Sequence, residues 1–246
     1  MNLLVSLLLL VSTTAFANVE YDGTDDMQSC GTSDVITENG AITICWWANR
    51  NGAGGGGNAR ILQRGSVVLF LTGTGSLSYE FQVAGTTTLR RATANSTITA
   101  DTWEHWCVKW DGSTTAANAD IFKNGTETTY QATVNGATLT NNSTDTLYIG
   151  NRADGLRAWD GFIDEFAVWS SQLSNAEIAH LAASRTRGLP LQISPSSLKY
   201  YLPFDECAEG AACATASMFR DRSGQGNHCS PSNNPTGRGG AILSYP

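Results

Sequence analysis

The alternation of apolar and polar residues is clearest between residues 160 and 181. Residues 160–169 read Asp-Gly-Phe-Ile-Asp-Glu-Phe-Ala-Val-Trp, and period-two aromatic and β-branched residues predict a strand. One side of that strand should carry Phe162, Asp164, Phe166 and Val168, and the other Ile163, Glu165, Ala167 and Trp169. Because both sides hold bulky apolar groups, we expect a central strand covered on both faces.

The period changes after residue 169. Ser174 and Glu177 have the spacing of a capping box, and Ile178 and Leu181 lie three residues apart on one helical face. A short polar turn and one small helix should therefore follow the strand.

The rest of the chain predicts short strands joined by turns. Alternation and turn residues mark strands within 19–27, 41–48, 60–63, 66–71, 77–83, 87–92, 102–110, 146–150 and 198–206. Asn124-Gly125 predicts a hairpin, because both positions tolerate positive φ. Residues 49–58 form a Gly-rich loop, which no Gly-Lys-Ser/Thr follows, so it is not a phosphate loop. Residues 185–197, with two prolines, predict a surface connector.

The composition suits one large all-β domain of 246 residues. The chain has 15 Lys plus Arg against 22 Asp plus Glu and no basic cluster, which argues against nucleic-acid binding. The acidity indicates either solubility or cation binding.

Residues 1–17 predict a cleaved signal peptide. An apolar run from Leu3 to Val11 ends at the A-x-A site Ala15-Phe-Ala17, although no Lys or Arg precedes the run. The run is too short to span a bilayer and no later stretch could cross one, so we expect no membrane insertion. The mature chain should begin near Asn18 and be secreted.

Six cysteines remain in the mature chain, and an even number in an exported chain implies disulfides. Six cysteines allow fifteen pairings. Cys207 and Cys213 flank a short loop and favour one pair. Cys45 and Cys107 lie in Trp-rich strands, which favours a bridge between sheets. Cys30 and Cys229 then remain. No C-x-x-C occurs, so a cysteine metal cluster is disfavoured.

Four stretches together resemble the laminin G-like (concanavalin A-like, pentraxin-like) jelly rolls. Residues 160–181 resemble the closing F-x-G-x-I-D-E-V-x-[IV]-[WY]…L-S-x-x-E-I motif of that family, and residues 21–27 its F-D-G-x-D-D-Y opening. Residues 42–48 and 103–112 resemble its T-I-S-A-W and W-H-H-V-A-V-T-Y-D-G strands. The resemblance implies an all-β, two-sheet antiparallel jelly-roll sandwich with one short helix.

The order of the motifs departs from the family. Residues 198–206 and 219–228 resemble a W-S-F-D-E…D-x-S-G-N-G-N-H-G stretch that elsewhere precedes the opening motif. We therefore expect a circularly permuted sandwich, in which residues 198–246 complete a single domain, 18–246, with neighbouring termini. The alternative, a truncated second repeat, would leave unpaired strand edges.

The loop from residue 221 to 228 is the candidate metal site. Oxygen-bearing side chains at alternating positions, with glycines between them, can wrap a hard cation. The resemblance implies a structural Ca²⁺ between this loop and the central strand. The predicted ligands are Asp221, Asn227 and Asp164, with backbone carbonyls near Ser223 and His228. An ordinary Asx-turn without metal is the alternative.

An enzyme is the weaker hypothesis. Laminarinase-like relatives use E-x-D-x-E on one strand, and this chain has no such motif. Asp164 and Glu165 are adjacent and should point to opposite faces. A polysaccharide hydrolase dependent on Glu165 stays as a third possibility.

Most of the seven tryptophans should be core, and Trp47, Trp110 and Trp169 match core positions of the family. Trp159 is the candidate ligand aromatic, because it lies in a loop beside Arg152 and Arg157. Glycosylation sequons begin at Asn95, Asn124, Asn141 and Asn142.

The sequence thus predicts a secreted, disulfide-linked jelly roll that binds carbohydrate or a cell-surface partner without catalysis. The main alternative is a structural subunit of a surface, virion or filament assembly, in which the sandwich packs against copies of itself.

Overall fold

The computed structural model describes residues 17–32, 36–37, 39–72, 78–142, 144–184, 187–213 and 219–239. The predicted signal peptide lies outside this set except for Ala17, the first residue of β1 (Ala17–Asp22). Among the described residues, no helix has both the length and the apolar character needed to cross a bilayer.

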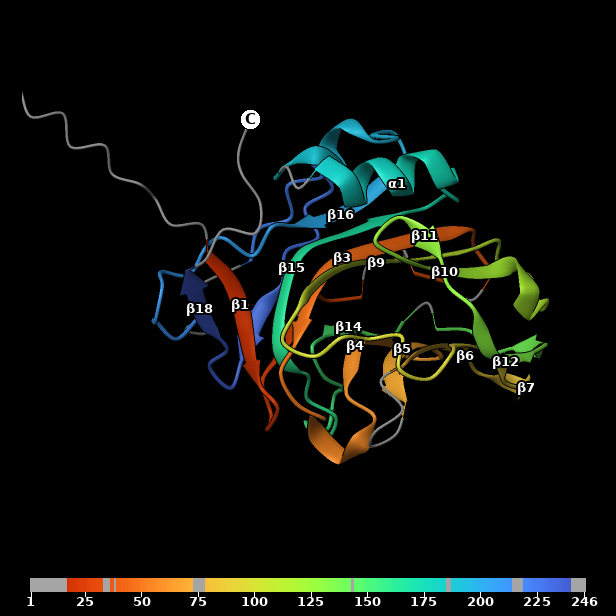
Figure 1. Cartoon of the computed structure of the whole chain (residues 1–246), viewed down its shortest axis with the longest axis horizontal. Coiled ribbons are helices and arrows are strands. Elements are labelled where there is room, and N and C mark those ends of the chain that lie inside the picture. Colours follow the sequence, from red (N-terminus) through yellow and green to blue (C-terminus); the bar gives the residue numbers. More distant parts are fainter. Residues whose placement is uncertain are drawn as a thin grey trace, which may run out of the picture.

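Two antiparallel sheets pack face to face (Figure 1). The first sheet has the order β11 (Thr126–Glu127), β10 (Ala119–Lys123), β9 (Trp103–Trp110), β3 (Ile42–Arg50), β15 (Asp160–Trp169), β1 and β18 (Thr236–Gly239), and β16 (Leu198–Leu202) also pairs with β15. The second has the order β12 (Tyr130–Val134), β8 (Leu89–Thr93), β6 (Ser78–Val83), β5 (Val67–Thr72), β4 (Arg60–Arg64), β14 (Leu147–Ile149), β2 (Met27–Ser29) and β17 (Ser230–Ser232).

The smaller elements lie outside these sheets. They are the strand pair β7 (Gly85–Thr87) and β13 (Ala137–Leu139), the helix α1 (Asn175–Ser184), and the 3₁₀ turns η1 (Gly55–Gly57), η2 (Ala116–Asn118) and η3 (Leu189–Gln192). The predicted two-sheet jelly roll with one short helix is confirmed.

The strands after residue 197 belong to both sheets. β16 and β18 extend the first sheet, and β17 extends the second through β2. Ala17 pairs with Gly239, so the two ends of the described chain lie side by side. β18 covers an edge that β1 would otherwise expose, and β17 does the same for β2.

The main core fills the space between the sheets. Tyr79 is its centre: its ring lies 5.5 Å from Trp46 and 4.7 Å from Trp106, both edge-on, and 6.1 Å from Trp159, stacked. All four side chains are fully buried, and each large aromatic group removed from water stabilises the fold by roughly 2–3 kcal/mol.

A second core lies on the outer face of the first sheet, under α1 and η3 (Figure 1). Ile178 and Leu181 of α1 are buried there with Trp169. The predicted capping box forms, because Ser174 Oγ accepts the Glu177 amide at 3.2 Å and Glu177 Oε2 accepts the Ser174 amide at 2.8 Å. β15 is therefore covered on both faces, as its pattern predicts.

The predicted alternation along β15 is wrong at one point. Ile163 and Phe166 both face the main core, although they were expected on opposite sides. The register against β3 shifts between Asp164 and Ala167, and Glu165 has φ +50°. A β-bulge with a residue in the left-handed region inserts one extra residue and so reverses the faces beyond it.

All three favoured disulfides form: Cys30–Cys229, Cys45–Cys107 and Cys207–Cys213. The sequence favoured a Cys45–Cys107 bridge between the two sheets, and that expectation is wrong. The bridge joins the neighbouring strands β3 and β9, where the two cysteines are directly opposed. The Asn124-Gly125 hairpin is confirmed, with φ of +48° and +82° at its two positions.

Candidate functional site

The loop after residue 220 is organised by the Asp221 carboxylate. Its Oδ1 accepts the backbone N–H groups of Tyr201 at 3.0 Å and Ser223 at 2.9 Å. Its Oδ2 accepts the Asn227 amide at 2.9 Å and the Ser223 hydroxyl at 2.8 Å. The Asp221 amide in turn donates to His228 Nδ1 at 3.0 Å. These bonds use about four acceptor sites of the carboxylate and attach the loop to β16.

The predicted calcium ligands do not fit one coordination shell. The acceptor sites of Asp221 are filled by donors, and Asn227 Nδ2 donates to the Lys199 carbonyl at 2.8 Å. Asp164 is fully buried and pairs with Arg187, whose Nη2 lies 2.7 Å from Asp164 Oδ2. A carboxylate already neutralised by a buried guanidinium offers little to a cation. Calcium binding by the protein stays a prediction, and the contacts of these three residues do not support it.

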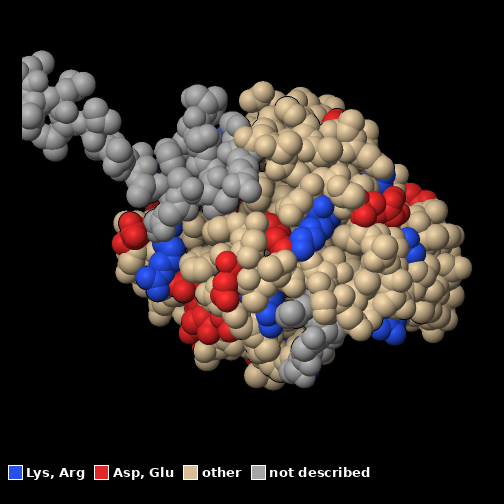
Figure 2. Space-filling view, in the orientation of Figure 1, with Lys and Arg blue, Asp and Glu red and all other residues tan. Residues whose placement is uncertain are grey.

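Two other groups of potential metal ligands occur among the described residues. Cys45, His105 and Cys107 lie together, but the two sulfurs are bonded to each other. The second group is Asp22, the last residue of β1, with Asp25 and Asp26. Acidic and basic side chains both gather at the end of the molecule that carries β1 and β18 (Figure 2). Acidic side chains in a turn are common without an ion, and we assign none here.

We expect Asp221→Ala to lower the melting temperature by about 9 °C, because losing the acceptor for four donors costs about 3 kcal/mol. EDTA should leave that difference unchanged, since the bonds of Asp221 are all to the protein itself. Thermal melts with and without EDTA check this. Glu209→Ala is the control, because Glu209 is an exposed acid in the same tail. A wild-type melting temperature that falls with EDTA to the level of Asp221→Ala would contradict the expectation.

Glu165 belongs to a buried charged cluster rather than to an open site. The Tyr201 hydroxyl donates to its carboxylate at 2.8 Å, and Arg187 Nη1 lies 3.3 Å from Glu165 Oε1. Burial raises the pKa of Glu165 to about 7, while Arg187 and the Tyr201 hydroxyl act in the opposite direction. Asp164, Glu165 and Arg187 are each at most 4% exposed. A substrate on the surface cannot reach these carboxylates.

The prediction that Trp159 contacts a ligand is wrong. Trp159 is 0% exposed and stacks on Tyr79 within the main core. Its amide donates to the Gly150 carbonyl at 2.7 Å, which fixes the residue at the start of β15. Its place next to a strand, rather than its charged neighbours, determines its environment.

Arg152 and Arg157 lie on the surface, and the structure adds a third arginine to them. Asn151 Oδ1 accepts the amides of Arg152 at 2.8 Å and Arg157 at 2.9 Å. The amide of Arg60, the first residue of β4, donates to the Arg157 carbonyl at 2.8 Å. The backbones of the three arginines are thus tied together. Arg60 is 97 positions from Arg157 in the sequence, so closeness along the chain does not reveal it.

The outer face of the second sheet presents two cross-strand rows. One row follows the register Tyr148, Gln63, Val68, Gln82 and Arg90. The next begins with Arg60, opposite Phe70, and continues to Glu80 and Ala92. The second core lies on the other sheet, so α1 and η3 do not cover this face (Figure 1).

Two clefts open on this face. The first, of about 340 Å³, is lined by Gln63, Gly65, Thr144, Asp145, Thr146, Tyr148 and Ala153. The second, of about 510 Å³, is lined by Thr72, Glu80, Arg90, Ala92, Asn95, Gln131 and Ala132. Both volumes fall within the range typical of small-molecule sites. Each cleft has one carboxylate among these residues, and Glu80 is paired with Arg90 at 2.5 Å.

Comparison with known proteins identifies the fold. Residues 22–179 match the laminin G-type model of the concanavalin A-like lectin/glucanases superfamily. A structure titled a "putative carbohydrate binding protein" from Bacteroides ovatus shares 16% identity at a TM-score of 0.61, and the match covers 94% of this chain and 61% of that one. The heptameric SAP-like pentraxin of Limulus polyphemus shares 14% identity at a TM-score of 0.45, covering 72% and 85%.

The mouse laminin α1 chain, domains LG4-5, shares 12% identity at a TM-score of 0.46, covering 63% of this chain and 41% of that one. The comparison with curated proteins finds no match. The family match extends over more than half of the chain, and the two-sheet topology of the described residues agrees with it. The chain therefore belongs to the concanavalin A-like lectin/glucanases superfamily, in its laminin G-type family.

Proposed function

We propose that the protein is a secreted, non-catalytic carbohydrate-binding module and that the outer face of the second sheet is its glycan-binding surface. The observation that carries this proposal is the pair of clefts on that face. The superfamily takes in lectins and glucanases alike, so the chemistry of the face has to decide between binding and hydrolysis.

The residues of the face suit sugar hydroxyls. Gln63 and Gln131 line the clefts and Gln82 lies in the row beside them, and their planar amides both donate and accept hydrogen bonds. Three threonines also line the clefts. Tyr148 adds a partly exposed ring at the first cleft, and such a ring packs against the C–H face of a sugar while its hydroxyl stays wet.

The same face lacks the arrangement for hydrolysis among its described residues. Glycoside hydrolysis uses two carboxyl groups that flank one scissile bond. The first cleft has Asp145 and the second has Glu80. The adjacent pair Asp164 and Glu165 is buried and bound to Arg187. This supports recognition without turnover.

The disulfides support an extracellular setting. Three bridges use all six cysteines, and such bridges persist in oxidising compartments. In this proposal the protein meets its glycan partner outside the cell, either free or on a cell surface.

Binding to a glycan array and to soluble polysaccharides tests the proposal. We expect Tyr148→Ala to weaken binding about tenfold, because it removes an aromatic contact at the first cleft. Leu191→Ala is the control, since Leu191 is 41% exposed on η3, on the first-sheet side. EDTA should leave binding unchanged, and no reducing ends should be released. Ordered polymers without affinity for any saccharide would instead support a structural subunit.

A further inference from the structure

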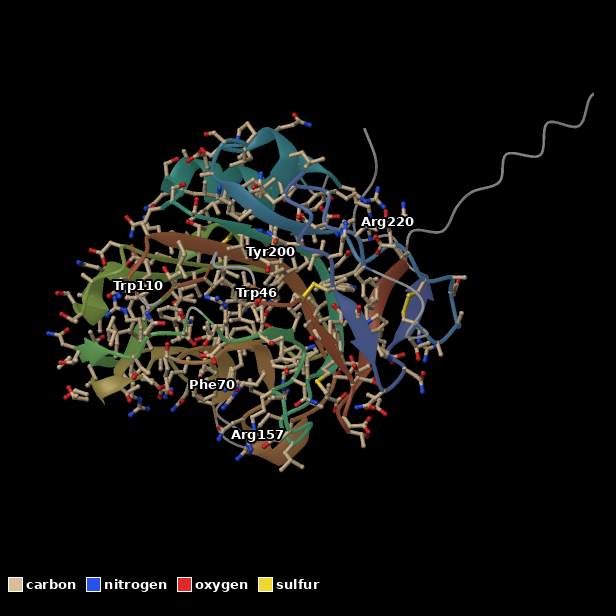
Figure 3. The ribbon with its side chains drawn as sticks, turned by 180° about the vertical axis from the view of Figure 1, so that it is seen from behind. Trp46, Phe70, Trp110, Arg157, Tyr200 and Arg220 are labelled. Atoms are coloured by element: carbon tan, nitrogen blue, oxygen red, sulfur yellow. A yellow bond between two sulfur atoms is a disulfide. The ribbon has the colours of Figure 1, made fainter. Side chains whose placement is uncertain are left out.

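Three arginines form a fixed cationic group beside the first cleft. Asn151 is fully buried and holds the loop of Arg152 and Arg157 with its Oδ1, while its Nδ2 donates to the carbonyls of Gly155 at 3.2 Å and Asp26 at 3.3 Å. The loop is therefore attached to the body of the protein at several points. Figure 3 shows Arg157 at the same end of the molecule as Phe70.

The guanidinium of Arg60 is held in one orientation. Its Nη1 donates to the Asn58 carbonyl at 2.9 Å, and its Nε donates to Gln63 Oε1 at 3.3 Å. Its Cζ atom lies over the Phe70 ring, 4.6 Å from the ring centre. A guanidinium that is oriented before binding loses less entropy when it pairs with an anion.

The other two arginines leave the group with an excess of positive charge. Arg152 pairs with Asp154 at 2.6 Å. Arg157 Nη1 donates to the Gly56 carbonyl, and Arg157 Nε is buried without a partner. Burial, followed by the charges of Arg152 and Arg157, lowers the pKa of Arg60 to about 10, and Asp154 is the opposing charge. Three cations thus face one carboxylate, in a chain whose net charge is −7.

The first cleft adjoins this group. Gln63, which accepts the Arg60 bond, lines the cleft, and so does Ala153, the neighbour of Arg152. Leu156, between the arginines, is 63% exposed. The surface therefore offers a cationic end beside a polar cleft whose one carboxylate among the lining residues is Asp145.

We infer that the ligand is an acidic saccharide, with its carboxylate or sulfate held by Arg60, Arg152 and Arg157 and the hydroxyls of the sugar in the first cleft. This inference rests on the proposed glycan-binding function. Planar guanidinium groups match the paired oxygens of a carboxylate or a sulfate. The excess of positive charge would repel a cationic ligand at this end and give a neutral sugar no comparable attraction.

Titration calorimetry with matched oligosaccharides tests the inference: an oligouronate, a sialylated trisaccharide, a sulfated oligosaccharide and their neutral counterparts. We expect one acidic class to bind at least tenfold more tightly than its neutral counterpart, with affinity falling as salt rises. The carboxylated and sulfated sugars show which anion the group prefers.

Substitutions within the group separate charge from fold. Arg157→Gln and Arg152→Gln should each weaken binding of the acidic sugar about tenfold and leave the neutral sugar unaffected. Asp154→Asn should tighten binding, because it removes the competing carboxylate. Arg222→Gln is the matched control, since Arg222 is 43% exposed and pairs with Asp205 away from the cleft.

Three outcomes overturn the inference. If neutral and acidic sugars bind alike, the acidic specificity is wrong and the proposed function stands. If Asp154→Asn and Arg157→Gln change affinity in the same direction, the effect is not one of charge. If no saccharide binds at all, both the inference and the proposed function fail.

Discussion

Arg187→Met should lower stability by about 3–5 kcal/mol at neutral pH, the cost of leaving a buried charge without its partner. Arg187 is 2% exposed and contacts Asp164 at 2.7 Å and Glu165 at 3.3 Å. Methionine keeps most of the side-chain volume but leaves two carboxylates in an apolar setting. For a chain of this size, the melting temperature should fall by about 12 °C.

The loss should depend on pH in a defined direction. Burial raises the pKa of Asp164 and Glu165 above their ordinary values, and Arg187 opposes that rise. Without Arg187 both values rise further, so the variant favours protonated carboxyl groups in the folded state. The protonated carboxyl groups contribute stability that is fully present below their unfolded-state pKa of about 4. This stability is lost as pH rises through their pKa in the folded variant. The difference from wild type should therefore be larger at about pH 8 than at about pH 5.

A triple variant separates charge from packing. Adding Asp164→Asn and Glu165→Gln to Arg187→Met removes both unpaired charges and should recover much of the lost stability. Denaturant melts of the single and triple variants, at both pH values, make the comparison. A single variant that loses the same free energy at each pH, with no recovery in the triple variant, would show that Arg187 acts through packing alone.

The pairing of residues 198–239 with the two sheets could be predicted from sequence, because this stretch contains recognisable family motifs. The stretch after residue 197 resembles the family segment that elsewhere precedes the opening motif. In the structure, β16 pairs with β15, β17 with β2, and β18 with β1. The capping box was equally accessible, since Ser174 and Glu177 act within one turn. Local chemistry was sufficient for the capping box, and the resemblance of the tail to a family motif was sufficient for its pairing.

The bulge at Glu165 could not be predicted from the period-two pattern of the strand. A period-two pattern assumes extended φ at every residue, and Glu165 has φ +50°. One signal was present: two adjacent carboxylates in an otherwise apolar strand need a cation, and Arg187 follows in the connector. The need for a counter-charge indicates a buried ion pair, although it does not give the register.

The arginine group shows the same limit on a larger scale. Arg152 and Arg157 were found as neighbours in sequence, but Arg60 joins them through one backbone hydrogen bond between β4 and a distant loop. The error on Trp159 has a related cause, because the strand that starts at Asp160 carries Trp159 into the core. Which side chains meet on a sheet depends on register, which a single sequence leaves open.

Replacing Cys30 and Cys229 by serine should destabilise the protein more than replacing Cys207 and Cys213. The first bridge closes a loop with a sequence separation of 199, and the second a loop with a separation of 6. Chain entropy assigns about 5 kcal/mol to the longer closure and about 2 kcal/mol to the shorter. The melting temperature should fall by about 15 °C in the first variant and about 6 °C in the second.

The location of the first bridge adds a local effect to the global one. Cys30 follows β2 and Cys229 precedes β17, so the bridge holds the end of the tail against the second sheet. Without it, β17 and β18 depend on pairing with β2 and β1 alone, and limited proteolysis should cleave the tail before the sandwich. Equal melting temperatures for the two variants, together with cleavage at the same sites in both, would show that the tail is held by strand pairing and not by the crosslink.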